Sequence, residues 1–199
     1  MHFISYIPLI IAWLIFGLSH SFLASGFVKQ AAIKIMNGSY KYYRFLYSVF
    51  ATLLLIIVVD IHVSTVSLPV WQPLLVEKII AIMLIIAGLA IMIACTKKYF
   101  MDLSGIDAIL GKSAPLVLQT KGMHTYVRHP LYTGTLLFVW AVYLYAPYWN
   151  NLISCICITL YTLIGMYFEE KKLVVEYGDA YVEYQKQVPA LLPLKYGRV

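Results

Sequence analysis

Long apolar stretches separated by short polar segments dominate the chain. A transmembrane helix needs about 20 mostly apolar residues, and five stretches come close to this length. Their expected bounds are 3–23, 45–63, 78–95, 131–146 and 152–168. The pattern predicts an all-α fold, a polytopic membrane helix bundle with about five transmembrane helices. We expect one membrane domain over residues 1–199, in which 1–95 supply three spans and 96–199 supply the last two spans and the cofactor site.

Composition agrees with this interpretation. Of the 199 residues, 62% are hydrophobic and 12% are charged, whereas soluble domains carry about 25% charged residues. The mean hydropathy is +0.81. The net charge is +6, but no compact basic stripe stands apart from the spans, so no nucleic-acid partner is expected. The cysteines and histidines lack metal-binding spacings, so no metal is expected.

The placement of Lys and Arg predicts the orientation of the chain. Basic residues accumulate on cytosolic loops. If the N-terminus lies outside, every Lys and Arg except Lys78 falls on the cytosolic side. We therefore expect an integral, multi-pass membrane protein whose N-terminus is outside and whose C-terminus is cytosolic.

Two polar regions on the cytosolic side have helical character. The segment 96–129 is long for a loop, and its apolar residues predict a short interfacial helix. After Glu169, apolar and aromatic residues recur on one face of a helix. These residues are Leu173, Tyr177, Tyr181, Tyr184 and Val188. We expect a C-terminal amphipathic interfacial helix that lies on the membrane or against the bundle, although Gly178 interrupts its pattern.

The richest chemistry lies at the ends of the last two predicted spans. Arg128 and His129 precede Pro130, which suits the first turn of a helix. The free N–H groups of that turn, together with the basic pair, would hold an anion. The next span is expected to end on Glu169 and Glu170. Either pair alone is more simply an interfacial anchor. Because the two spans have nearly equal length, both pairs should meet at one membrane surface, which favours a polar small-molecule site.

The residues of this region carry a resemblance to a known family. The first motif consists of Gly122, Tyr126, Arg128, His129, Pro130, Tyr132 and Gly134. The second consists of Glu169, Glu170, Leu173, Tyr177, Gly178, Tyr181, Tyr184, Val188, Pro189 and Pro193. Together they resemble the cofactor motifs of integral-membrane S-adenosylmethionine-dependent methyltransferases. That family includes isoprenylcysteine carboxyl methyltransferase, phospholipid methyltransferases and bacterial methanethiol S-methyltransferases. One departure is His124, where the family often has an aromatic residue.

The resemblance implies a fold, a cofactor and site residues. S-adenosylmethionine would bind at the cytosolic side, between the last two spans and the C-terminal helix, in a bacterial inner membrane. The implied cofactor-binding residues are Gly122, Tyr126, His129, Pro130, Tyr132, Gly134, Glu169 and Glu170. Arg128 and Glu170 are the expected catalytic residues, the first for binding an anion or orienting the acceptor. Glu170 would hold polar groups of the cofactor or, as the less favoured role, act as a base. Alanine at either position should abolish methyl transfer without preventing membrane insertion.

The acceptor and two other functions stay open. The acceptor is a small or lipophilic thiol, isoprenylcysteine carboxylate or lipid amine. Membrane sterol reductases carry a similar Arg-His-Pro-x-Tyr segment and use NADPH, but they have more spans. A non-enzymatic transport or assembly protein is the other alternative, although the chain lacks paired Gly/Pro-interrupted spans. His20, near the cytosolic end of the first span, is interpreted as a packing or snorkelling histidine.

Overall fold

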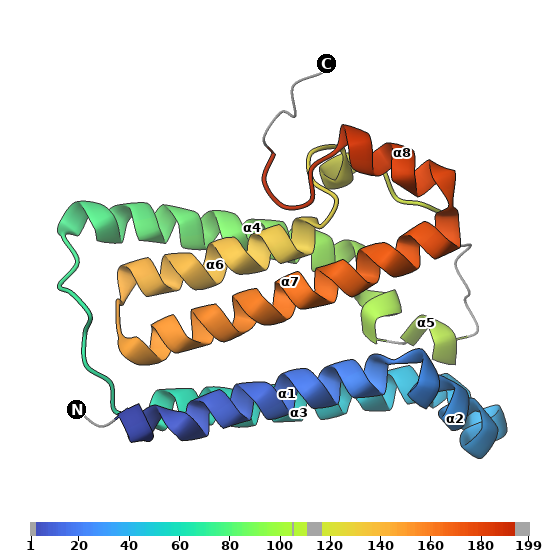
Figure 1. The fold of residues 1–199 in the computed structure, drawn as a ribbon, viewed down its shortest axis with the longest axis horizontal. Helices are drawn as coiled ribbons and strands as arrows, with labels where there is room; N and C mark the ends of the chain where they lie inside the picture. The colour runs from blue at the N-terminus through green and yellow to red at the C-terminus, as the bar shows by residue number, and fades with distance from the viewer. Residues whose placement is uncertain (1–2, 105, 111–116, 194–199) are drawn as a thin grey trace.

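The long helices lie in two layers and run alternately in opposite directions (Figure 1). The computed structural model describes residues 3–104, 106–110 and 117–193, and these contain helices and no strand. One layer holds α1 (Ile7–Ala24), α2 (Gly26–Met36) and α3 (Tyr43–Ser64). The other holds α4 (Leu75–Ser104), α6 (Pro130–Tyr145) and α7 (Trp149–Tyr177). The predicted all-α membrane bundle is confirmed.

Short elements complete the described chain. They are the 3-10 helices η1 (Phe3–Tyr6), η2 (Asn37–Tyr42) and η3 (Gly122–Thr125), and the helices α5 (Ile106–Ile109) and α8 (Asp179–Gln187). α5 falls within the segment where a short interfacial helix was predicted. Residues 105 and 111–116 of that segment lie outside the described residues.

Four helical stretches have the length and composition to cross a membrane. They are Ile4–Ala24, Gly26–Ser64, Leu75–Lys97 and Trp149–Tyr177. The fifth predicted span corresponds to α6, an apolar helix of 16 residues, which is slightly shorter than the usual range of about 17–25 residues. These helices mark the chain as an integral membrane protein.

The predicted end of the third span at 95 agrees with the apolar stretch Leu75–Lys97, although the helix α4 continues to Ser104. The prediction that the last helix ends on Glu169 and Glu170 is wrong, because α7 continues to Tyr177. Polar side chains do not end a helix by themselves, because Glu and Lys have high helix propensity. α7 ends only at Gly178, whose φ of 57° lies in the left-handed region that glycine tolerates. Glu169 and Glu170 therefore lie inside α7, two turns before its end.

The single amphipathic helix predicted after Glu169 is also wrong, because Gly178 divides it into the end of α7 and the separate helix α8. α8 turns back over α7, toward the start of α6 (Figure 1). Its aromatic face lies against the bundle, since Tyr181 and Tyr184 are only 1% and 8% exposed. The reversal brings the C-terminal segment to the N-terminus of α6.

Two glycines allow α4 and α6 to pack closely. A Cβ atom on Gly134 of α6 would lie 2.9 Å from Ile91 Cγ2 of α4. A Cβ atom on Gly88 of α4 would lie 2.9 Å from the backbone nitrogen of Phe138. Small residues at such contacts let helix backbones approach each other in membrane proteins. This packing fixes the position of α6, and with it the position of the residues at its start.

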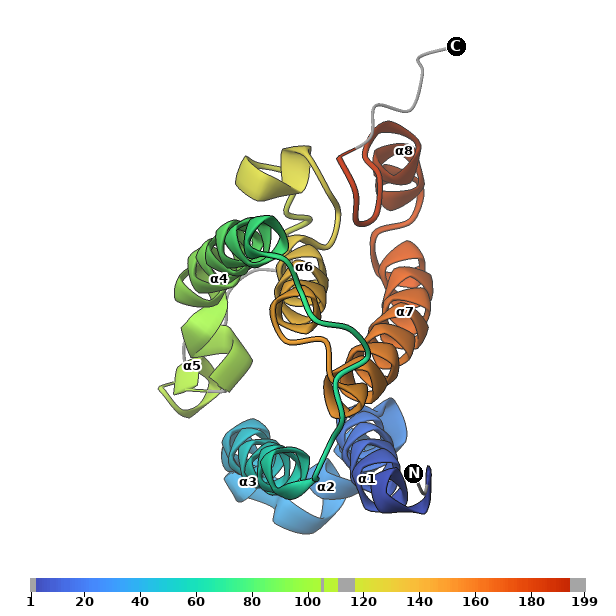
Figure 2. The ribbon, with the colours of Figure 1, turned by 90° about the vertical axis from the view of Figure 1, so that its left-hand side faces the viewer.

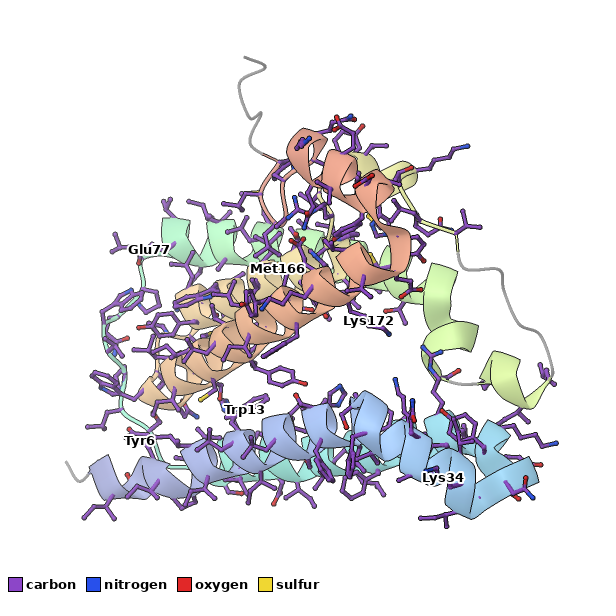
Figure 3. The ribbon with its side chains drawn as sticks, turned by 45° about the vertical axis from the view of Figure 1, so that its right-hand side comes forward. Tyr6, Trp13, Lys34, Glu77, Met166 and Lys172 are labelled. Carbon is purple, nitrogen blue, oxygen red and sulfur yellow. The ribbon has the colours of Figure 1, made fainter. Side chains whose placement is uncertain are left out.

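The two layers are joined at one end by a polar network. Trp13 Nε1 on α1 donates a hydrogen bond of 2.9 Å to Ser154 Oγ on α7. His62 Nδ1 on α3 lies 2.9 Å from the same hydroxyl. Toward the other end, Lys172 lies on the side of α7 that faces the layer holding Lys34 (Figure 3). Seen end-on, α1 lies beneath α7 and α3 lies beneath α4 (Figure 2).

Candidate functional site

Arg128 joins three parts of the chain just before α6. Its Nε and Nη2 donate hydrogen bonds of 2.7 and 2.9 Å to the two carboxylate oxygens of Glu170 on α7. Its Nη1 donates to the carbonyl oxygens of Gln185 and Val188, at 3.2 and 2.6 Å. A bidentate arginine–carboxylate pair is strong and geometrically specific. With only 11% of its side chain exposed, Arg128 connects α7, α8 and the segment after α8.

Glu170 accepts further hydrogen bonds besides those from Arg128. His129 Nε2 lies 3.0 Å from Oε1, and Tyr181 donates its hydroxyl to the same oxygen at 3.3 Å. Gln185 Nε2 donates to Oε2 at 2.9 Å. An ionised carboxylate has about four lone-pair sites, and five donors from four side chains approach this one. Its acceptor capacity is therefore used within the protein.

His129, Tyr132 and Glu169 form a second group on the neighbouring side of α7. The rings of His129 and Tyr132 are stacked, with centroids 5.3 Å apart and planes 14° apart. Tyr132 donates its hydroxyl to Glu169 Oε2 at 2.7 Å, and His129 Nδ1 lies 3.8 Å from the same oxygen. The Glu169 side chain is 44% exposed. Glu169 therefore has acceptor capacity that Glu170 lacks.

The start of α6 is already occupied by the C-terminal segment. The backbone N–H groups of Arg128 and His129 donate to the carbonyl oxygens of Pro189 and Ala190, at 2.9 and 3.0 Å. Thr133 Oγ1 donates to Leu191 O at 2.7 Å. These contacts differ from the expectation that the basic pair and the helix start would be free for an anion. The protein's own carbonyl and carboxylate groups accept from the Arg128 side chain and from the backbone N–H groups of Arg128 and His129, which precede the first turn of α6.

The hairpin prediction is confirmed in one respect, since Arg128 and His129 meet Glu170. The other predicted site residues lie further out. Pro130 is buried at the first position of α6, and Gly134 faces α4 in the packing described above. Gly122 has a φ of 71° at the start of η3, and Tyr126 is 69% exposed. Roles for these four residues in binding a cofactor stay predictions.

Two residues of this hydrogen-bond network were not predicted from the sequence as members of the site. The side chain of Gln185 bonds Glu170, and its carbonyl oxygen accepts from Arg128. His124, the departure from the family motif, has its Nδ1 3.1 Å from Arg128 O, and its own carbonyl oxygen accepts the Tyr184 hydroxyl at 2.5 Å. Only the reversal of the chain at Gly178 brings α8 to these residues, and helix periodicity does not reveal a reversal.

Burial and the charge of Glu170 keep the Tyr181 hydroxyl of α8 protonated. Burial raises the pKa of Tyr181, and the negative charge of Glu170 raises it further. The Tyr181 hydroxyl therefore stays protonated and keeps donating to Glu170. Among the residues that the structure describes, no group of three or more His, Cys, Asp or Glu side chains is arranged to hold a metal ion. The site offers an exposed carboxylate and a stacked aromatic pair beside a rigid ion pair.

Comparisons with known proteins point to methyl transfer. The model of the phospholipid methyltransferase family matches residues 74–180, more than half of the chain. The methanethiol S-methyltransferase of Crocosphaera subtropica is 38% identical over 79 residues, 40% of this chain and 30% of that protein. The protein-S-isoprenylcysteine O-methyltransferase of Schizosaccharomyces pombe is 35% identical over 81 residues, 39% of this chain and 34% of that protein.

A third relative, the methanethiol S-methyltransferase of Pseudomonas deceptionensis, is 40% identical over 75 residues, 38% of this chain and 28% of that protein. The matches thus span about a third of the length of these curated relatives. No solved structure matches the chain.

Proposed function

Because the chain belongs to the phospholipid methyltransferase family, we propose that it transfers a methyl group from S-adenosylmethionine to an acceptor at the cytosolic face of a bacterial inner membrane. The observation that carries the proposal is the group of His129, Tyr132 and Glu169, held between α6 and α7 beside the Arg128–Glu170 pair. The acceptor is a thiol, an isoprenylcysteine carboxylate or a lipid amine, the classes that the resemblance implies.

The chemistry of the donor set fits S-adenosylmethionine. When bound, this cofactor supplies a methyl group already activated on a sulfonium. The exposed carboxylate of Glu169 suits an ammonium or the hydroxyls of a ribose. The ring of Tyr132, which stacks on the buried imidazole of His129, offers an apolar surface next to that carboxylate. With an activated methyl group, the protein mainly has to align the reactants, and alignment alone contributes roughly 7–11 kcal/mol to lowering a barrier.

We assign Arg128 and Glu170 a positioning role. Their side chains are bonded to each other, to His129 and to α8, so most of their hydrogen-bonding capacity is used within the protein. The pair fixes His129 and holds α8 against α6. Rigid support of this kind keeps binding groups in the correct geometry. Loss of Arg128 or Glu170 should therefore lower methyl transfer through disorder of the site, while the spans still insert.

The orientation is part of the proposal. Among the residues that the structure describes, the Lys and Arg residues other than Lys78 lie in segments that share one side in the alternating helix order. Basic residues favour the cytosolic side, and the group around Glu169 lies toward the same ends of the helices. A polar cofactor would thus enter from the cytosol, and a lipophilic acceptor would enter from the bilayer between helices.

A ligand titration followed by an activity assay tests the proposal. Detergent-purified protein is titrated with S-adenosylhomocysteine and, separately, with NADPH, and the thermal unfolding midpoint is followed. A ligand that binds only the folded state stabilises it by about 2.7 kcal/mol at a hundredfold excess over Kd. We expect stabilisation by S-adenosylhomocysteine alone, with transfer of a labelled methyl group to one acceptor class.

A matched pair of variants tests whether S-adenosylhomocysteine binds near Glu169. Glu169→Gln should weaken S-adenosylhomocysteine binding. Glu77→Gln, which changes a carboxylate near the opposite end of the molecule (Figure 3), should leave binding unchanged. Stabilisation by NADPH alone would replace the proposal with a reductase. If the wild-type protein responds to neither ligand and methylates no acceptor, the proposal is wrong.

A further inference from the structure

His20 on α1 has a buried nitrogen that lacks a partner. Its Nδ1 is the single buried side-chain nitrogen or oxygen without a hydrogen bond among the described residues. An unsatisfied buried polar group costs about 1–3 kcal/mol, and native structures keep few of them. Such a group calls for an explanation, of which a catalytic role is one. The sequence alone suggested a packing or snorkelling histidine, and neither role explains a buried nitrogen without a partner.

Aromatic side chains from three helices surround the imidazole of His20. Its ring centroid lies 5.6 Å from that of Phe16 on α1, 5.1 Å from that of Tyr47 on α3 and 6.1 Å from that of Tyr161 on α7. Hydrogen bonds hold this cluster, since Ser21 Oγ donates to the Tyr161 hydroxyl at 3.3 Å. The rings around the imidazole are apolar, so a thiol would suit these surroundings better than a charged group would.

The cluster and the Glu169 group are connected along α7. Tyr161 and Glu169 are eight residues apart on this helix, which is about 12 Å of helical rise. Gly165 lies between them, and a Cβ atom added there would meet no atom within 4 Å. At the other end of this stretch, Glu169 accepts the Tyr132 hydroxyl. A ligand held at Glu169 and extending along α7 would therefore approach His20.

We propose that His20 is a catalytic residue that accepts the proton of a thiol acceptor, and that Phe16, Tyr47 and Tyr161 form the wall of the acceptor site. This inference rests on the proposed function. A free cysteine thiol has a pKa of about 8.5, so such a thiol is mostly protonated at neutral pH, and the thiolate is the nucleophile. A neutral thiol therefore needs a base near the methyl donor. A carboxylate acceptor arrives without a proton and gives an unpaired imidazole nothing to accept.

The step balances with the groups named. The S–H bond of the thiol breaks, and its proton moves to Nδ1 of His20. The sulfur lone pair attacks the methyl carbon, and a new S–CH3 bond forms. The bond between that carbon and the sulfonium breaks, and its electron pair stays on the departing sulfur. The products are a thioether, S-adenosylhomocysteine and a protonated imidazole, which returns its proton to solvent.

The test compares two thiols that differ in their need for a base. Ethanethiol is mostly protonated at neutral pH, whereas an acidic aryl thiol such as 4-nitrobenzenethiol is already ionised. Rates of methylation are measured for the wild-type protein and for His20→Gln and His20→Asn, whose amides resemble different edges of the imidazole. His62→Gln is the control, because His62 lies at the opposite end of the helices and bonds Ser154. S-adenosylhomocysteine titration verifies that each variant is folded.

We expect the His20 variants to lose about 100-fold or more of the ethanethiol rate, since general-base catalysis contributes about 10²–10⁴-fold. The aryl thiol rate should change far less, and His62→Gln should leave the ratio of the two rates as in the wild-type protein. Equal losses for both thiols would assign His20 a structural role and overturn the proposal. Unchanged rates for both would do the same.

The acceptor range separates this proposal from the one on which it rests. If the wild-type protein methylates an isoprenylcysteine carboxylate or phosphatidylethanolamine but neither thiol, the methyltransferase assignment stands and the role of His20 is wrong. If it methylates no acceptor and does not bind S-adenosylhomocysteine, both proposals fall together.

Discussion

Replacing Glu170 with glutamine should damage the fold more than ligand binding, whereas the same change at its neighbour Glu169 should do the reverse. Glutamine keeps the shape of the side chain but replaces one acceptor oxygen with an N–H donor. At position 170 that donor would face a donor of Arg128 whichever oxygen it replaced, because Arg128 donates to both. The substitution also leaves an arginine that is 11% exposed without its counter-charge.

The magnitude follows from these contacts. Net hydrogen bonds to charged groups contribute about 1.5–3 kcal/mol each, and breaking a fully buried ion pair costs about 3–5 kcal/mol. Glu170 is 19% exposed, so solvent screens part of the lost interaction, and about 3 kcal/mol is expected. Glu169 is 44% exposed and accepts one hydroxyl. Its substitution should cost about 0.5–1 kcal/mol.

Two measurements on the same detergent-purified proteins test this contrast. Titration with sodium dodecyl sulfate, followed by tryptophan fluorescence, gives the change in the free energy of unfolding. Calorimetry with S-adenosylhomocysteine gives the affinity, which Glu169→Gln should lower at least about tenfold, or 1.4 kcal/mol. The reasoning is refuted if Glu170→Gln is as stable as the wild-type protein, or if Glu169→Gln binds the ligand normally.

Three further predictions concern packing, the chain reversal and pH. Gly134→Ala should destabilise the protein by about 1–3 kcal/mol in the same unfolding titration, because the new methyl group overpacks the α4–α6 contact. Gly26→Ala, which meets no atom within 4 Å, should show no such loss. Gly178→Ala should weaken S-adenosylhomocysteine binding, since alanine disfavours the φ of 57° that places α8; unchanged affinity would contradict this role. The pKa of Tyr181 is raised above its ordinary value of 10.0 by burial and by Glu170, so stability should fall as the pH rises above that value. Tyr181→Phe should remove part of this alkaline loss, and identical pH profiles would contradict it.

The helices could be predicted from the sequence, but their polar ends could not. Hydropathy located all five long helices, because apolar length is the dominant requirement for spanning a bilayer. It did not show that α4 and α7 continue as helices beyond their apolar parts, where charged residues follow. Glu169 and Glu170 illustrate the difference, since a pair expected at a helix end lies well inside α7. The true end is set by the backbone conformation of Gly178.

The meeting of the two polar pairs was predicted from the sequence, but the other hydrogen bonds around them were not. The near-equal lengths of the last two spans correctly indicated that Arg128 and Glu170 would meet. The sequence did not indicate that the same arginine would donate to carbonyl oxygens after α8, or that Gln185 would share the carboxylate. Such contacts depend on the direction in which α8 leaves Gly178, which is a tertiary property. The spacing of aromatic residues indicated which face of α8 is buried, but it did not indicate which residues that face contacts.

The path of the C-terminal segment has a consequence for how the protein is made. The carbonyl oxygens of Pro189 and Ala190 accept the backbone N–H groups of Arg128 and His129, and Gln185 completes the set of donors on Glu170. These residues follow α7 along the chain, so they leave the ribosome after the long apolar helices that the structure describes. A nascent chain can thus insert all its apolar helices while the start of α6 still lacks these partners. The contacts at the start of α6 form only after translation has passed Ala190, and a chain that stops before Gln185 would occupy the membrane without them.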